Sequence, residues 1–241
     1  MRRILAIGGG GFMMESTLSP IDTYIRELAG VPRPRVCFIP TASGDLPTHI
    51  ENFYRVYEQL DCEASHLTFF RQADRNAIPL TELASQLMDQ DVIFVGGGNT
   101  KSALAVWREW GVDEVLRRAW EHGVLLSGMS AGAICWFQEG FTDSFGNSYY
   151  RPLPCLGLLD GACSVHHSGD PARALALHDA LLDGGVSSSV AIDDFAAVLY
   201  EGDAIHQCVS WRANATAHRV FLEEGRVCEE SFESVPLSKT P

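Results

Sequence analysis

Gly128-Met129-Ser130-Ala131-Gly132 follows the apolar run Val124–Leu126 and leads into the helix-like segment Ala131–Phe137. The order is therefore strand, tight turn, helix. Small residues on both sides of the serine suit a nucleophile elbow, because that strained turn brings neighbouring backbones too close for larger side chains. Such a turn exposes the Ser130 hydroxyl above the end of a sheet. The Ala131 N–H then directs partial positive charge at the place where an oxyanion would form. A glycine-rich turn that merely contains a serine is the competing interpretation.

Before the elbow, short apolar runs alternate with amphipathic segments of helical length. The predicted strands are Ile4–Ile7, Val36–Ile39, His66–Phe69, Val92–Val95 and Val124–Leu126. The predicted helices are Pro20–Ala29, Pro47–Leu60, Leu80–Gln90 and Lys101–His122. Repeated strand–helix units predict a parallel sheet covered by helices on both faces.

The pattern changes after the elbow. Further strands are predicted at Val190–Asp193, Ala197–Tyr200, Ala204–Trp211 and Val220–Val227. Glycine-containing turns such as Glu201-Gly202-Asp203 separate them, which favours antiparallel strands appended to the sheet. No Ser/Gly tract, Pro run or charge block marks a linker. We therefore expect one domain over residues 1–241 of the α/β class, with a three-layer, doubly wound and mostly parallel sheet.

Charge and cysteine usage restrict the partners and the compartment. The formal net charge is -13 and the 18 Lys and Arg residues are scattered, so nucleic acid and anionic membranes are not expected as partners. Seven cysteines, an odd number without C-x-x-C spacing, indicate buried free thiols and a reducing compartment. No apolar segment is long enough to span a bilayer. The cytoplasm is therefore the expected location.

Three glycine-rich turns follow predicted strands, where open α/β sheets bind their ligands. They are Gly8–Gly11, Gly96–Thr100 and the elbow. A dinucleotide fingerprint that starts at Gly8 would need glycine where Met13 stands. A phosphate loop would need glycine immediately before Lys101, where Thr100 stands. Both nucleotide-binding interpretations therefore fail on spacing.

A serine nucleophile needs a base, and His166-His167 is the best candidate because the short strand Gly161–Val165 ends there. Side chains alternate along a strand, so only one of the two rings can face Ser130. A packed or surface histidine is the competing interpretation for either residue.

The base in turn needs a carboxylate that stabilises its charged form. Asp143 lies in the loop after the predicted elbow helix, and Asp193 and Asp194 lie at the end of a later strand. Each could instead be a turn aspartate that bonds its own backbone. Cys135 is a rival nucleophile on paper, but its place in the segment after the elbow indicates a core residue.

Together these motifs resemble the dipeptidase E (α-aspartyl dipeptidase) and cyanophycinase family of serine peptidases, which share the class I glutamine amidotransferase-like fold. The motifs are Gly96-Gly97-Gly98-Asn99-Thr100, Gly128–Ala133, Thr142-Asp143, a histidine that opens a loop, and Ala191-Ile192-Asp193-Asp194. The likeness extends from the first strand to about Ser210. It implies Ser130 as nucleophile, His166 as base and Asp143 as third member. It also implies an oxyanion hole from the N–H groups of Ala131 and the Gly97-Gly98 turn.

The resemblance implies a hydrolase that cleaves small peptides without a metal or organic cofactor, and it allows a homodimer. Asp-Xaa dipeptides would need a cation at the site, for which Arg173 is the candidate, with Asn99 as a second substrate contact. The chain departs from the dipeptidases in two places. Val165 precedes the histidine where they commonly have proline, and the loop between His166 and Arg173 is shorter. A catalytically silent domain that binds a metabolite or a partner is the alternative.

Overall fold

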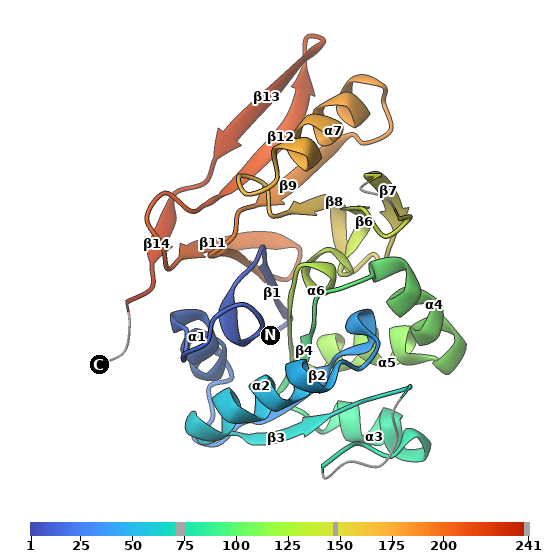
Figure 1. The fold of residues 1–241 in the computed structure, drawn as a ribbon, viewed down its shortest axis with the longest axis vertical. Coiled ribbons are helices and arrows are strands. Elements are labelled where there is room, and N and C mark those ends of the chain that lie inside the picture. The colour runs from blue at the N-terminus through green and yellow to red at the C-terminus, as the bar shows by residue number, and fades with distance from the viewer. Residues whose placement is uncertain (71–75, 147–148, 239–241) are drawn as a thin grey trace.

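In the computed structural model, which describes residues 1–70, 76–146 and 149–238, the strands form two sheets (Figure 1). The main sheet contains, in spatial order, β14 (Ser234–Pro236), β11 (Ala204–Ser210), β10 (Ala196–Glu201), β1 (Arg3–Ile7), β5 (Leu125–Met129), β4 (Val92–Val95), β2 (Arg35–Ile39) and β3 (Glu63–His66). The second sheet contains β13 (Arg226–Ser231), β12 (Ala217–Glu223), β9 (Ser188–Ile192), β8 (Leu159–Val165), β6 (Phe137–Thr142) and β7 (Arg151–Pro154).

The main sheet has the predicted parallel centre and antiparallel edge. Strands β1, β5, β4, β2 and β3 pair in parallel, and β10 joins β1 antiparallel, with Leu5 opposite Leu199. The α/β class with mixed, mostly parallel pairing is thereby confirmed. The expectation of one sheet was wrong, because β9, β12 and β13 pair with β8 and β6 in the second sheet.

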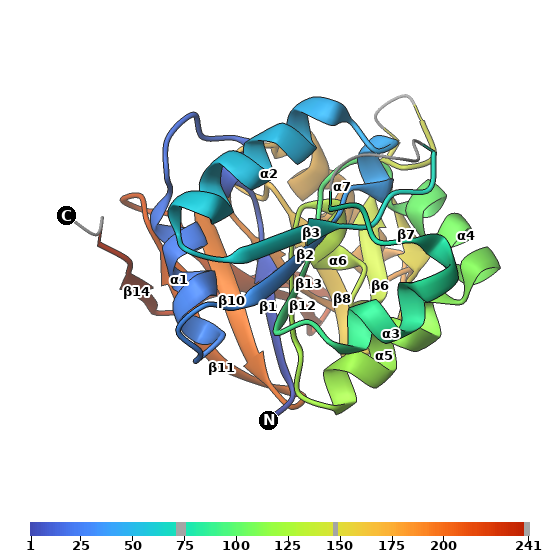
Figure 2. The same cartoon turned by 90° about the horizontal axis from the view of Figure 1, so that it is seen from below.

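Helices cover both faces of the main sheet (Figure 2). On one face α1 (Pro20–Leu28) and α2 (Pro47–Gln59) pack on alternate strand residues such as Leu5 and Phe38. On the other face lie three further helices, which are α3 (Leu83–Met88), α4 (Thr100–Trp110) and α5 (Val112–Glu121). Residues of opposite parity, such as Ile4, belong to this second core.

Several predicted elements have different bounds, and the strand predicted at Val220–Val227 is a hairpin of β12 and β13. The predicted helix Lys101–His122 is two helices, because Gly111 between α4 and α5 has a φ of 67° and ends the first one. The segment after the elbow forms only one helical turn, α6 (Ala131–Ile134), before β6 begins at Phe137. The strand predicted at His66–Phe69 lies at Glu63–His66.

The second sheet lies between the main core and one further helix. Phe137, Leu159 and Val165 share the core that contains α4 and α5. The opposite face packs on α7 (Pro171–Leu182) through a smaller cluster that includes Leu177 and Val220. In the described residues no helix combines the length and the apolar character that a membrane crossing needs.

The chain changes sheets at two places that matter for function. After β5 it passes through α6 into β6, and after β9 it returns through Asp193–Phe195 into β10. A backbone bridge between Gly9 and Asp194 joins the second crossover to the end of β1. Both crossovers therefore lie at the carboxyl ends of the central strands, where α/β sheets carry their sites.

Candidate active site

Ser130 lies in a strained turn between β5 and α6, as the glycine spacing predicts. Its φ is 56° and its ψ is -112°, and its N–H donates to Ile7 O over 3.0 Å. A Cβ on Gly128 would lie 2.3 Å from Gly132 O, and one on Gly132 would lie 2.1 Å from Val95 O. Both glycines are therefore required because the elbow backbone packs directly on neighbouring backbone.

The Ser130 hydroxyl contacts a histidine that in turn contacts a carboxylate. His166 Nε2 lies 2.9 Å from Ser130 Oγ, and His166 Nδ1 lies 2.6 Å from Asp194 Oδ1. The side chains of His166 and Asp194 are 24% and 27% exposed, so the pair is accessible to a substrate and yet largely surrounded by protein. Three residues that span 64 positions of the chain, from Ser130 to Asp194, thus form one hydrogen-bonded series.

The two adjacent histidines lie in different surroundings. His166 follows the last residue of β8 and has a φ of 56°, which directs its ring at Ser130. His167 is buried, its Nε2 lies 3.4 Å from Glu229 Oε1, and its ring centroid lies 5.2 Å from that of His218. Burial lowers the pKa of His167. Of the two rings, the structure brings His166 to the serine.

Asp143 does not contact His166, which contradicts its predicted place as the third member. Its Oδ1 lies 3.7 Å from an Arg173 guanidinium nitrogen. The prediction placed Asp143 directly after the elbow helix. Instead, strand β6 intervenes between the elbow helix and Asp143, whose side chain then faces Arg173. The alternate candidate Asp194 takes the position beside the ring.

Asp193 points to the other side of the chain from Asp194. Its Oδ1 accepts the N–H of Ser168 at 3.0 Å, and its Oδ2 accepts the N–H of Thr216 at 3.1 Å. His218 Nε2 also lies 3.4 Å from Oδ2. Burial alone would raise the pKa of Asp193, but these hydrogen bonds outweigh it and hold the value at about 2.

The glycine run after β1 packs directly against the histidine and the carboxylate, a role that the sequence did not predict. A Cβ on Gly9 would lie 2.0 Å from Asp194 Oδ1 and 3.1 Å from His166 Cε1. Phe195 N–H donates to Gly9 O over 2.7 Å, and Phe195 has a φ of 64°. The sequence did contain a signal for this role, namely a run of four glycines at a strand end that did not fit a nucleotide-binding motif. Glycine is also required where another part of the chain approaches the backbone closely.

The predicted oxyanion residues lie beside Ser130. A Cβ on Gly97 would lie 3.2 Å from Ser130 Cβ, whereas its N–H is directed at the thioether of Met13, 3.5 Å away. Gly98 has a φ of 140°, and a Cβ there would lie 2.2 Å from Ala42 O. Within the described part of the chain, the N–H groups of Gly98 and Ala131 have no protein acceptor. These two donors are available to a bound oxygen.

The two predicted substrate contacts are both engaged within the protein. The side-chain oxygen Oδ1 of Asn99 accepts the N–H of Ser102 at 2.9 Å, which caps α4, and the side-chain Nδ2 of Asn99 donates to Ser144 O. The Arg173 side chain is only 8% exposed and lies between Asp143 and Asp170. Its guanidinium also lies over the Tyr150 ring, 4.8 Å from the centroid. Its charge is therefore already paired, which weakens the prediction that it binds a substrate carboxylate.

Cys135 is buried, and burial raises its pKa well above the ordinary thiol value, so its thiolate is not accessible as a nucleophile. Within the described residues no group of three or more His, Cys, Asp or Glu side chains is arranged to hold a metal ion.

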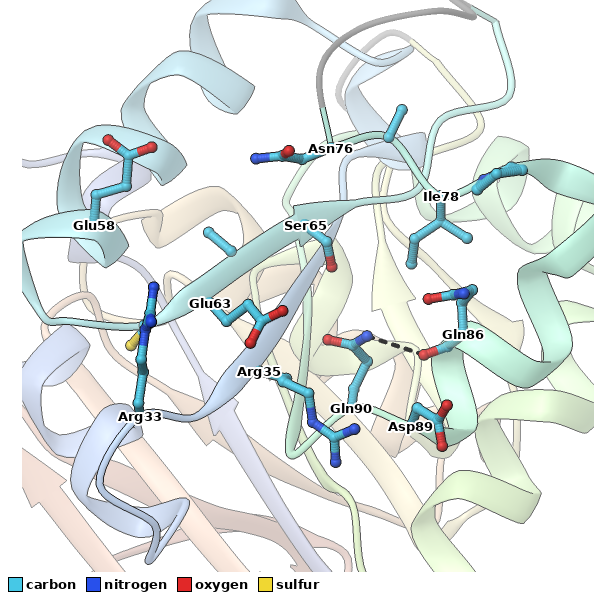
Figure 3. A pocket seen from close by; sticks show the side chains of 14 residues that line it. Arg33, Arg35, Glu58, Glu63, Ser65, Asn76, Ile78, Gln86, Asp89 and Gln90 are labelled. Carbon is cyan, nitrogen blue, oxygen red and sulfur yellow. Dashed lines mark hydrogen bonds between the residues drawn. The ribbon is translucent and has the colours of Figure 1, made fainter.

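A hollow of about 600 Å³ lies far from this chemistry, along the edge strand β3 (Figure 3). Its lining is polar and includes Arg35, Ser65, Gln86 and Gln90, and Gln90 donates to the Gln86 carbonyl. Arg35 is paired with Asp91 outside the hollow. None of the predicted site residues contributes to its lining.

A serine on a strand-to-helix elbow, backed by a histidine and an aspartate, defines the class of serine hydrolases by geometry and roles. Comparison with known proteins identifies the family. The model of peptidase family S51 matches residues 4–208, and the chain belongs to this family of serine peptidases. The uncharacterized peptidase YgaJ of Bacillus subtilis (strain 168) is 44% identical over 229 residues, covering 95% of this chain and 96% of that protein.

Two solved structures share the fold. A putative peptidase E from Listeria monocytogenes EGD-e has a TM-score of 0.66 at 18% identity and covers 88% of this chain and 100% of its own. A peptidase from an acI-B1 Actinobacterium has the same TM-score and identity and covers 95% of this chain and 96% of its own.

Proposed function

We propose that this peptidase cleaves amide bonds of small peptides through an acyl-enzyme, with Ser130 as nucleophile, His166 as base and Asp194 as the orienting carboxylate. The observation that carries the proposal is the hydrogen-bonded series in which His166 lies 2.9 Å from Ser130 and 2.6 Å from Asp194. Family membership and the amidotransferase-like fold class, which the resemblance implies, agree with it.

In the first half-reaction, Ser130 Oγ attacks the carbonyl carbon and its proton moves to His166 Nε2. The tetrahedral intermediate collapses, the C–N bond breaks, and His166 gives the proton to the leaving amine. Water then attacks the ester by the same route and releases the acid. Asp194 favours the imidazolium in both halves because its carboxylate accepts from Nδ1.

The developing oxyanion would be held by the N–H groups of Ala131 and Gly98, which have no acceptor within the described residues. Gly97 would contribute its small size, since any side chain there would press on Ser130. Its own N–H would join them only after the Met13 thioether moves aside.

For the substrate, we propose short peptides with at most a weak preference for an N-terminal aspartate. A desolvated carboxylate on the substrate needs a cation that is not already neutralised. Arg173 is held between Asp143 and Asp170 and does not meet that condition.

The alternative is a catalytically silent domain that binds a small metabolite or a partner through the same surface. A fluorophosphonate probe separates the two functions, because it phosphonylates only a serine whose hydroxyl is activated by a base. We expect labelling at Ser130, located by peptide mass spectrometry. An unlabelled, folded protein would favour the binding module.

The second measurement is the turnover of wild type and variants on a panel of dipeptides with and without N-terminal Asp. Ser130→Ala keeps the Cβ and should lower turnover by at least about a thousandfold. Cys135→Ala is the matched control at a nearby buried nucleophile and should retain most activity. Full activity of a folded Ser130→Ala protein would refute the acyl-enzyme.

A further inference from the structure

The loop that carries His166 begins with a strained backbone conformation. Strand β8 ends at Val165, and His166 then adopts a φ of 56°, which is strained for a non-glycine residue. Such a conformation persists only where its surroundings enforce it. The backbone bonds nearby are His167 N–H to Ile192 O and Asp170 N–H to His166 O.

The Asp193 carboxylate ties this loop to two other segments. Oδ1 accepts both the N–H and the hydroxyl of Ser168, two residues after the catalytic histidine. Oδ2 accepts the N–H of Thr216, just before β12, and faces His218 Nε2 on that strand. The side chain of Asp193 is only 4% exposed, so few water molecules can replace these donors.

Consecutive carboxylates therefore hold consecutive parts of one loop. Asp194 accepts from the His166 ring, and Asp193 fixes the backbone two residues further on. We propose that Asp193, supported by His218, is the positioning residue that sets the His166 ring against Ser130 and Asp194. This inference rests on the proposed function, because it assumes that His166 is the base.

The charge state of Asp193 agrees with this role. Hydrogen bonds outweigh burial and lower its pKa to about 2, while the bond to Asp193 raises the pKa of His218. The other titratable groups near His218 are His167, on the loop that carries His166, and Glu229 on β13. Glu229 also accepts a hydrogen bond from His178 on α7 at 2.7 Å. The Asp193 carboxylate and the His218 ring thus lie 3.4 Å apart beside the loop that carries the catalytic histidine.

The test substitution is Asp193→Asn, because an amide cannot replace this carboxylate. The two backbone N–H donors approach different oxygens, and an amide has only one acceptor, so its NH₂ group must face either Ser168 or Thr216. We expect the loop to shift and the rate constant of fluorophosphonate labelling at Ser130 to fall about 10- to 100-fold. We also expect the midpoint of its pH profile to move to lower pH, because a shifted loop weakens the contact with Asp194 that favours the protonated base.

A loss of stability alone would not move that midpoint in the molecules that remain folded, so the pH profile separates positioning from general support. Asp179→Asn, the same change on the exposed surface of α7, is the matched control and should behave as wild type. Ser168→Ala keeps the backbone donor and should cost less than Asp193→Asn. If Asp193→Asn does not fold, His218→Gln decides, and its labelling rate constant should fall by a smaller factor.

The two possible failures are distinct. Wild-type protein that the probe does not label would refute the proposed function. Labelled wild type together with an Asp193→Asn or His218→Gln profile that matches it in rate and midpoint would refute the positioning role alone.

Discussion

The two sheets contribute different parts of the candidate site. The main sheet supplies the nucleophile, because Ser130 follows β5 and its N–H is bonded to Ile7 at the end of β1. The second sheet supplies the proposed base and its carboxylate, because His166 follows β8 and Asp194 follows β9. The first half is built from a short local motif. The second half depends on how two parallel strands align whose paired residues, such as Ala162 and Ser189, are 27 positions apart in sequence.

The difference explains why one half was easier to predict. An elbow requires small residues within two positions of the serine, and the sequence displays them together. The partner of His166 depends on where β9 ends relative to β8 and on the crossover that returns the chain to β10. The spacing of residues in the sequence does not predict how β8 and β9 align.

The two histidines give the largest expected difference within the second sheet. His166→Ala should lower turnover by between about a thousandfold and a millionfold, because it removes the group that accepts the serine proton. His167→Ala should leave most activity, since that ring lies against Glu229. Steady-state kinetics on the most active dipeptide measures both. Loss of activity only in the His167 variant would exchange their roles.

The two carboxylates give the next largest difference. Asp194→Asn should lower turnover by up to about ten-thousandfold, because an amide can orient imidazole but cannot stabilise imidazolium. Asp143→Asn should change turnover little, since Asp143 faces Arg173 and does not contact His166. Thermal unfolding of both variants serves as the control for folding. A larger loss from Asp143→Asn would restore the prediction made from sequence.

The smallest expected effect concerns Asp22, which lies next to the glycine run that follows β1 in the main sheet. Asp22 is fully buried, and its Oδ1 accepts the N–H of Phe12 at 3.3 Å, below the glycine run. Burial raises its pKa to about 7, so the folded state prefers the protonated acid. As the pH rises from the ordinary Asp value towards 7, the unfolded chain ionises first and stability is lost.

Asp22→Asn mimics the protonated acid and should remove that loss. The melting temperature of the variant minus that of wild type should therefore grow between pH 5 and pH 8, by a few degrees on the scale of ~2–4 °C per kcal/mol. Differential scanning calorimetry at both pH values measures it. A difference that is constant with pH would show that Asp22 does not titrate in this range.

Much of the main sheet could be predicted from the sequence, because alternating apolar runs and helix-length segments specify strand–helix units directly. The split into two sheets could not, since strands after the elbow carry the same pattern whichever sheet they join. Ser130 was predicted from the elbow. The strand end left His166 and His167 as alternatives, and only the family resemblance favoured His166. Asp143 was preferred for its proximity in sequence to the elbow, but the structure shows a full strand in between.

The glycines around the site restrict which sequences can encode it. An added Cβ at Gly8 would lie 2.1 Å from Asp193 O, and one at Gly9 would lie 2.0 Å from Asp194 Oδ1. At Gly185, far from the site, it would only touch Ala180 O at 3.4 Å. A library randomised at position 9 and selected for turnover should thus return almost only glycine, whereas one at position 185 should return many residue types. The candidate site therefore requires glycine at specific positions as strictly as it requires the residues proposed to react.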